Sequence, residues 1–147
     1  MAVQPEQVLE DNLVTQLVTL GYQVAQITDE KSLLANLKQQ LEKLNSLNSL
    51  SANEFKQILN ALSKGSVFEK AKTLRDRLQI NKDDGTALYI QFLADDWHKN
   101  QFQVTQQVTV EGRYQNRYDV TILVNGLPLV QIELKRRGLE LKEAFNL

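Results

Sequence analysis

Alternating apolar and polar positions near the carboxyl-terminal end of the chain predict a β-hairpin. Its two arms, residues 118–124 and 129–135, are rich in β-branched and aliphatic side chains. Between them, Asn125 and Gly126 are typical of a tight chain reversal. Pro128 lacks a backbone N–H and is compatible only with the start or the edge of a strand.

One face of this hairpin carries charged side chains. Because successive side chains of a strand point to opposite faces, Glu133 and Lys135 are expected on the same face. The apolar residues of this arm, expected to face a core, are Val130, Ile132 and Leu134.

Whether Asp119 shares that charged face depends on the register of the hairpin. A regular two-residue turn places Asp119 opposite Ile132, on the face away from Glu133. A three-residue loop over residues 125–127, with a left-handed residue and a bulge, places Asp119 directly opposite Glu133, with Cβ atoms about 4.5–5.5 Å apart. We therefore predict an odd loop or a bulge in this hairpin.

Two carboxylates at that separation repel each other, and a hard divalent cation relieves the repulsion. Such a cation can polarise a phosphoryl oxygen and lower the pKa of a bound water. Lys135 would then orient the water or balance charge on phosphorus. The alternative is an ordinary exposed sheet face with surface charges.

Two amphipathic helices are predicted in the first third of the chain. The first has an apolar stripe and ends at Gly21, with Glu10 at the edge between core and solvent. Its stripe consists of Val8, Leu9, Leu13, Leu17, Val18 and Leu20. The second helix has leucines at helical spacing: Leu33, Leu34, Leu37, Leu41 and Leu44.

Further elements are predicted between these helices and the hairpin. Ser51-x-x-Glu54 and Ser66-x-x-Glu69 are capping-box patterns that open short helices. Strands are expected over residues 86–93 and 101–110, and a helix over 139–145. The prediction is an α+β fold: a mixed or antiparallel sheet centred on the hairpin and flanked by helices, with a helical insertion over about 31–77.

Residues 116–138 closely resemble the nuclease segment of the R (restriction) subunits of type I restriction-modification enzymes. Residues 6–22, 32–37 and 99–104 resemble other segments of the same family. The resemblance implies a PD-(D/E)xK restriction-endonuclease-like core over residues 1–147, with its catalytic hairpin at residues 117–136.

The resemblance also implies roles for single residues. Asp119 and Glu133 fall on the metal-binding acids, and Lys135 falls on the catalytic lysine. Glu10 falls on the acid of the first helix that often lies near the metal. Leu134 would offer its backbone carbonyl to the metal.

Composition narrows the choice of metal and compartment. The chain has no cysteine and a single histidine, which excludes thiolate-held zinc and leaves oxygen-bound Mg²⁺ or Mn²⁺. With 42% hydrophobic and 24% charged residues, the 147-residue chain suits one globular domain. It has no apolar run long enough for a membrane helix and no signal-peptide pattern, so a cytoplasmic location is expected.

The net charge is −1, so the chain has no overall basic character. Basic residues nevertheless cluster around the predicted hairpin: Arg113, Arg117, Lys135, Arg136 and Arg137. With a bound cation, this patch would attract the phosphate backbone of DNA. Solvated side chains beyond a strand end are an equal alternative for Arg136 and Arg137 individually.

The resemblance implies metal-dependent cleavage of double-stranded DNA, in a complex with methyltransferase and specificity subunits. Family members continue into a glutamine-containing motif and a helicase-like motor, so this chain is expected to be an amino-terminal fragment, truncated at its carboxyl terminus. It has no P-loop, and ATP would bind only to the full-length subunit. Alternatives are a catalytically silent docking module of the same complex and a stand-alone repair nuclease.

Overall fold

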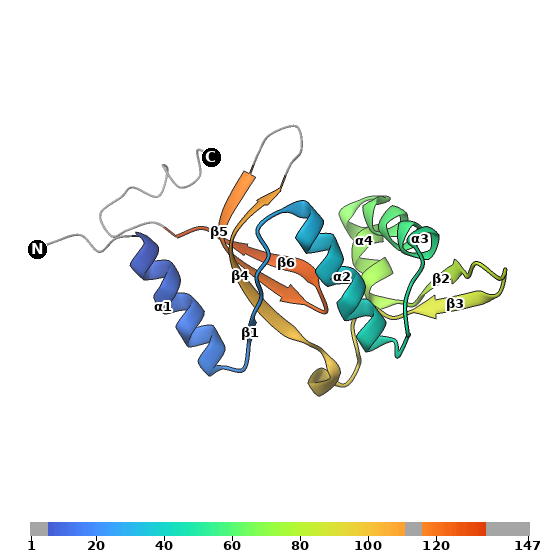
Figure 1. Ribbon diagram of the computed structural model, residues 1–147, viewed down its shortest axis with the longest axis horizontal. Helices are drawn as coiled ribbons and strands as arrows, with labels where there is room; N and C mark the ends of the chain where they lie inside the picture. Colours follow the sequence, from blue (N-terminus) through green and yellow to red (C-terminus); the bar gives the residue numbers. More distant parts are fainter. Residues whose placement is uncertain (1–5, 111–115, 135–147) are drawn as a thin grey trace, which may run out of the picture.

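A computed structural model of the chain describes residues 6–110 and 116–134 and contains a four-stranded sheet (Figure 1). The strand order is β1-β4-β5-β6, in which β1 runs parallel to β4 and the other neighbours are antiparallel. The strands are β1 (Gln23–Val24), β4 (Phe102–Val110), β5 (Asn116–Val124) and β6 (Leu127–Ile132). The predicted α+β fold with a mixed sheet flanked by helices is therefore confirmed.

The first two helices pack on opposite faces of this sheet. Helix α1 (Glu6–Thr19) contributes Val14 to a buried cluster with Val104 and Val120. Helix α2 (Glu30–Leu44) follows a capping box at its start, as do the next two α-helices. Leu33 of α2 packs on a cluster that contains Leu123, whose side chain lies on the other face from Val120. The sheet is thus covered on both sides.

Helix α2 is tied to the sheet by polar contacts as well. Asn36 donates to Oε1 of Gln103 at 2.9 Å, and Gln103 donates back to Oδ1 of Asn36 at 3.1 Å. This reciprocal amide pair satisfies the buried side chain of Gln103, which would otherwise be costly to desolvate.

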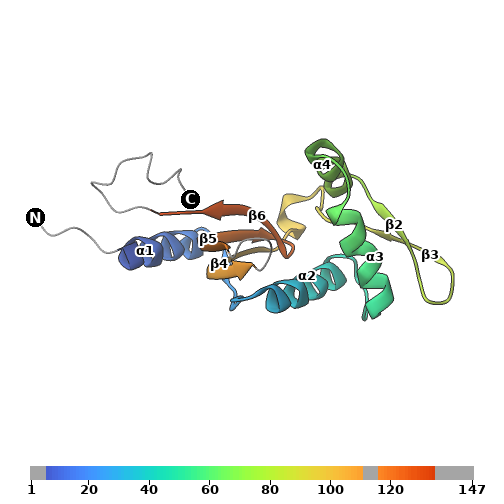
Figure 2. The same ribbon diagram turned by 90° about the horizontal axis from the view of Figure 1, so that it is seen from above.

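A second group of elements lies at the opposite end of the molecule from α1 (Figures 1 and 2). It comprises α3 (Ala52–Ser63), α4 (Val67–Arg75) and a hairpin of β2 (Leu78–Asn81) and β3 (Ala87–Ile90). The predicted capping boxes at Ser51 and Ser66 are both present. The strand predicted over residues 86–93 is shorter than expected.

One core cluster connects this second group to the four-stranded sheet. It joins α2 and α3 to the β2–β3 hairpin and reaches the start of β6; its buried members are Leu37, Leu41, Leu50, Ile58, Ile80, Ile90, Phe92 and Leu127. No helix within residues 6–110 and 116–134 has the length and apolar character that crossing a membrane requires. The helix predicted over 139–145 lies outside the described residues.

Candidate active site

The turn between β5 and β6 is a two-residue turn. Asn125 and Gly126 both have positive φ angles, 52° and 83°, and Val124 pairs with Leu127. These angles are those of a type I′ turn, for which Asn-Gly is the favoured sequence. The odd loop, the first of the two alternatives predicted for this hairpin, is therefore not formed.

A bulge nevertheless follows this turn. Leu123 pairs with Pro128, but the next pair is Ile122 with Val130, so Leu129 is an extra residue in β6. Pro128 has no N–H to donate to the ladder, and such residues are tolerated at bulges and edges. The predicted irregularity is confirmed, although it lies in the strand instead of the turn.

The bulge sets the register of the predicted metal ligands. Val120 pairs with Ile132, and one further step along both chains places Asp119 opposite Glu133. The backbone N–H of Leu134 donates to Oδ2 of Asp119 at 2.8 Å, so the two segments remain side by side beyond the last ladder pair. The register of the last ladder pair is thus the one in which Asp119 would face Glu133, as the predicted site requires.

The apolar residues beside Glu133 confirm its orientation. The side chains of Ile132 and Leu134 pack on the cluster beneath α1, so Glu133 between them lies on the opposite face, where it is exposed. Val130 was expected in the core, but it is 46% exposed. It belongs to the edge strand directly after the bulge, where α1 does not cover it.

Glu10 does not lie at the solvent edge of α1 as expected. It is only 4% exposed, and it shares a stripe of the helix with Leu13, Val14 and Leu17. Three residues assigned to the stripe are instead substantially exposed: Val8, Val18 and Leu20. Because the polar Glu10 lies on the buried face, the apolar residues of the helix alone predicted the wrong buried side.

Gln107 of β4 is the polar partner of Glu10, a contact that the sequence did not predict. Its side-chain amide donates to both carboxylate oxygens of Glu10, at 3.2 and 3.4 Å. Its φ of 59° lies in the left-handed region, which is uncommon for a residue other than glycine. Nothing in the sequence distinguishes it from Gln106, because a left-handed residue within a strand carries no local signature.

Several predicted site residues lie outside the described residues: Arg113, Lys135, Arg136 and Arg137. Arg117 lies on β5, but the placement of its side chain is not described. The backbone carbonyl of Leu134 stays a predicted ligand. Among residues 6–110 and 116–134, no three His, Asp or Glu side chains gather closely enough to hold one metal ion. The described site is therefore a pair of carboxylates, with Glu10 set apart from it.

A mixed sheet covered by helices, with two acids on its β5–β6 hairpin, is consistent with the PD-(D/E)xK class of nuclease fold. The sequence profile described as "Type I restriction enzyme R protein N terminus" matches residues 3–146. The chain therefore belongs to this family.

Known relatives are endonuclease subunits of type I restriction enzymes. The SauCOLORF180P endonuclease subunit of Staphylococcus aureus strain COL is 49% identical over 99% of this chain, and the SsaAORF53P subunit of Staphylococcus saprophyticus is 44% identical over 99%. The EcoprrI endonuclease subunit of Escherichia coli is 42% identical over 97% of the chain. The chain spans 16% of the length of the two staphylococcal relatives and 48% of the third.

Proposed function

We propose that this chain is the metal-dependent nuclease part of a type I restriction enzyme's R subunit and cleaves double-stranded DNA. The observation that supports the proposal is the bulge at Leu129, which sets the register in which Asp119 would lie opposite Glu133 on the neighbouring segment. The names of the relatives, all endonuclease subunits, support the same reaction class.

The two acids suit Mg²⁺ or Mn²⁺. Carboxylate oxygens are the ligands that hard divalent cations prefer, and a site with two of them keeps room for bound water. Such an ion would polarise the scissile phosphate and supply an activated water. The chain has no cysteine, and its one histidine, His98, lies in the short 3₁₀ helix η1 (Trp97–Lys99) instead of the hairpin.

The protein's own groups would orient these acids. The hydrogen bond from the N–H of Leu134 fixes one oxygen of Asp119 and thereby sets the direction of the whole carboxylate. Packing of Leu134 against the cluster beneath α1 fixes the backbone on which Glu133 stands. Lys135, two residues after Glu133, is proposed to stabilise the negative charge that develops on the phosphate.

Substrate and partners follow from the same proposal. Arg113, Arg117, Arg136 and Arg137 are proposed to contact DNA phosphates around the cut, and such contacts carry no sequence information. Site recognition and methylation would belong to the specificity and methyltransferase subunits. ATP-driven translocation would belong to a motor elsewhere in the full-length subunit.

Cleavage of plasmid DNA by the full-length polypeptide in its complex tests this function. With Mg²⁺ and ATP present, Asp119→Asn and Glu133→Gln should each lower the cleavage rate at least about 100-fold, as expected when transition-state stabilisation is lost. Asp83→Asn, in the exposed β2–β3 turn, is the matched control and should cut like wild type. Undiminished cleavage by either site variant would contradict the proposal.

A further inference from the structure

A polar pocket lies beside the turn of the β5–β6 hairpin, at the end of α2 that runs toward the second group of elements (Figure 1). Its volume is about 350 Å³. Asn125, which lines it, follows Asp119 by six residues, about 20 Å at the rise per residue of a strand. This amide pocket is therefore separate from the candidate active site. Its polar lining residues are Gln40, Lys43, Gln91, Lys99, Gln101 and Asn125.

Two asparagine side chains hold the backbone of the pocket's wall in place. Asn45 accepts from the N–H of Gln91 at 2.8 Å and donates to the carbonyl of the same residue at 3.0 Å. The side chain of Asn125 accepts from the N–H of Gln101 at 2.9 Å, and the N–H of Asn125 donates to the carbonyl of Gln101 at 2.9 Å. These bonds occupy the backbone of each glutamine and leave its side chain available.

The carboxamides that line the amide pocket have no partners of their own. Gln40, Gln91 and Gln101 are half-buried, and none of their side chains forms a hydrogen bond within residues 6–110 and 116–134. Protein amides that are shielded from solvent are usually hydrogen-bonded. Three carboxamides on one pocket, on a backbone that other residues hold fixed, are therefore available to a ligand.

Two lysines give the amide pocket a positive charge. Lys43 lies in the last turn of α2 and Lys99 lies in η1, and neither has an ion-pair partner in the described part of the chain. Among the described residues, no carboxylate lines the pocket. Glu42, the neighbour of Lys43, is instead bound by Lys38 and by the N–H of Leu50. The two ammonium groups therefore attract an anion.

The number of donors in the amide pocket favours a phosphate group over a carboxylate. An ammonium group has three donors and a carboxamide has two, whereas a carboxylate offers two oxygens in one plane. A phosphate group presents three strong acceptor oxygens around phosphorus, so it can accept from groups on several sides. The volume of the pocket, about 350 Å³, is that of a small-molecule site.

We propose that the amide pocket binds a phosphate group: its two lysines balance the charge, and its three glutamine carboxamides donate to the oxygens. Both a DNA backbone and a free nucleotide carry this group, and the test distinguishes these sources. The proposal does not depend on the nuclease function, because none of the pocket's residues belongs to the candidate active site.

Lysine footprinting of the full-length subunit tests this proposal. Reductive methylation, measured peptide by peptide by mass spectrometry, reports on Lys43 and Lys99 separately from any other phosphate site of the subunit. Saturating inorganic phosphate should slow methylation of both lysines at least about tenfold relative to acetate of equal ionic strength. The exposed Lys56 and Lys70 are the controls and should react at the same rate in both salts.

Three results of this footprint would overturn the proposal. They are equal protection of the pocket and control lysines, equal protection by acetate and phosphate, and pocket lysines that do not react even in acetate. Protection by a short DNA duplex but not by ATP assigns the site to a DNA backbone, and the reverse assigns it to a nucleotide. Protection by inorganic phosphate alone assigns it to the free ion.

A double variant separates a built pocket from general charge attraction. Gln91→Leu with Gln101→Leu removes two carboxamides but keeps both lysines and the backbone bonds to the asparagines. Half-maximal protection should then need at least about tenfold more phosphate, since hydrogen bonds to a charged group are lost. Gln39→Leu with Gln79→Leu, both exposed and outside the pocket, is the matched control and should behave like wild type. Unchanged protection in the Gln91 and Gln101 variant would show that the carboxamides do not bind phosphate.

Discussion

Asn125 fixes the hairpin turn through a buried side chain. Its amide donates to the carbonyl of Phe92 and to Oδ1 of Asn100, both at 2.8 Å, and its Oδ1 accepts from the N–H of Gln101 at 2.9 Å. The side chain is 1% exposed, and the residue also adopts the left-handed backbone that the turn needs. A single residue thus joins the β5–β6 hairpin to the loop before β4.

Replacing this residue should lower stability strongly. Asn125→Ala removes three hydrogen bonds, leaves buried partners unsatisfied and strains the positive φ, so we expect a loss of about 2–4 kcal/mol in the free energy of unfolding. Urea denaturation measures it. Asn60→Ala, on the exposed side of α3, is the control and should change stability by less than about 0.5 kcal/mol. A loss that small for Asn125→Ala would contradict the role of this network.

Single residues show where sequence reasoning succeeds and where it stops. The sequence correctly predicted that Glu133 and Leu134 point to opposite faces of the hairpin, because the alternation of side chains along a strand depends only on neighbouring residues. The burial of Glu10 could not be predicted, because its partner Gln107 is distant in sequence and is turned toward it by a backbone angle that the sequence does not encode locally.

The β5–β6 hairpin owes its register to the bulge at Leu129. Deleting Leu129 should remove the bulge and let Ile122 pair with Val130 directly, which keeps Asp119 opposite Glu133. Leu129 is 45% exposed, so little burial is lost. Removing Leu129 and Val130 together shifts the rest of β6 by one position, which turns Glu133 to the other face.

Mn²⁺ affinity, measured by calorimetry, distinguishes the two deletions. We expect the single deletion to bind within about threefold of wild type and the double deletion to bind at least about tenfold more weakly, since one carboxylate ligand is lost. Equal affinities for both deletions would show that this register does not determine the metal site.

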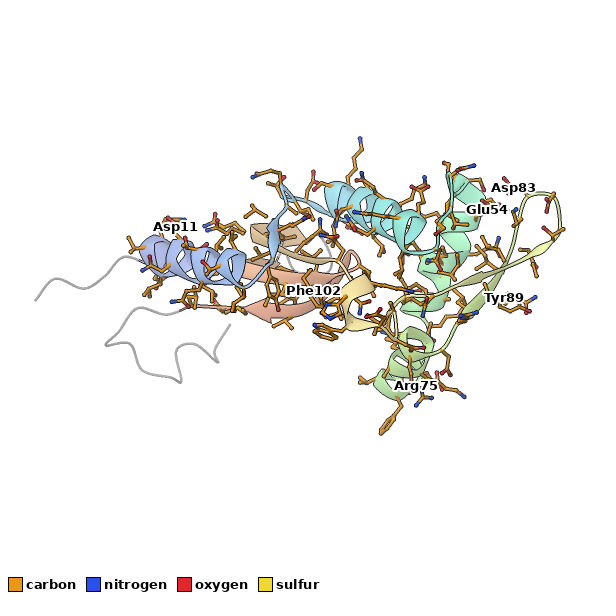
Figure 3. The ribbon with its side chains drawn as sticks, turned by 90° about the horizontal axis from the view of Figure 1, so that it is seen from below. Asp11, Glu54, Arg75, Asp83, Tyr89 and Phe102 are labelled. Atoms are coloured by element: carbon orange, nitrogen blue, oxygen red, sulfur yellow. The ribbon has the colours of Figure 1, made fainter. Side chains whose placement is uncertain are left out.

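Helix α3 is stabilised by a capping carboxylate. The backbone N–H groups of Ser51 and Asp83 donate to the carboxylate of Glu54, at 2.9 and 3.1 Å, and these bonds lower the pKa of Glu54 below its ordinary value. Figure 3 shows Glu54 and Asp83 side by side. The same carboxylate therefore ties the start of α3 to the β2–β3 turn.

This lowered pKa gives stability a defined pH dependence. A carboxyl group whose pKa is lower in the folded state stabilises the fold above its ordinary pKa of about 4.3, and this contribution is lost as pH falls toward the folded-state pKa. Melting temperature should therefore fall less steeply below pH 4.3 in Glu54→Gln than in wild type. Parallel curves for the two proteins would contradict this contribution. Glu69→Gln, the equivalent cap of the exposed helix α4, is the comparison.

The helices and strands that the sequence predicted correctly are those marked by a short sequence pattern. Both serine capping boxes and the strand over residues 101–110 follow from short patterns that need no distant partner. An irregularity was predicted for the β5–β6 hairpin, but its position after Pro128 was not. A three-residue turn and a bulge in the strand would each give the same register, so the sequence did not distinguish them. β1 is only two residues long and exists through its parallel pairing with β4, about 80 residues away.

The whole molecule combines a covered sheet with a helical region that shares one core with it. Gly126 illustrates the junction: a Cβ there would lie 2.7 Å from the Cα of Leu37, so the turn of the β5–β6 hairpin packs directly on α2. Composition and pattern predicted the fold class, but strand order and this junction arise from long-range packing that local patterns do not encode.

The central claim is that Asp119 and Glu133 together bind one divalent cation. Calorimetric titration of Mn²⁺ into wild type, Asp119→Asn, Glu133→Gln and the control Asp83→Asn tests it most directly. Saturable binding to wild type and control that is lost in both site variants is the predicted result. Binding of equal strength in all four proteins, or no binding to wild type, would contradict it.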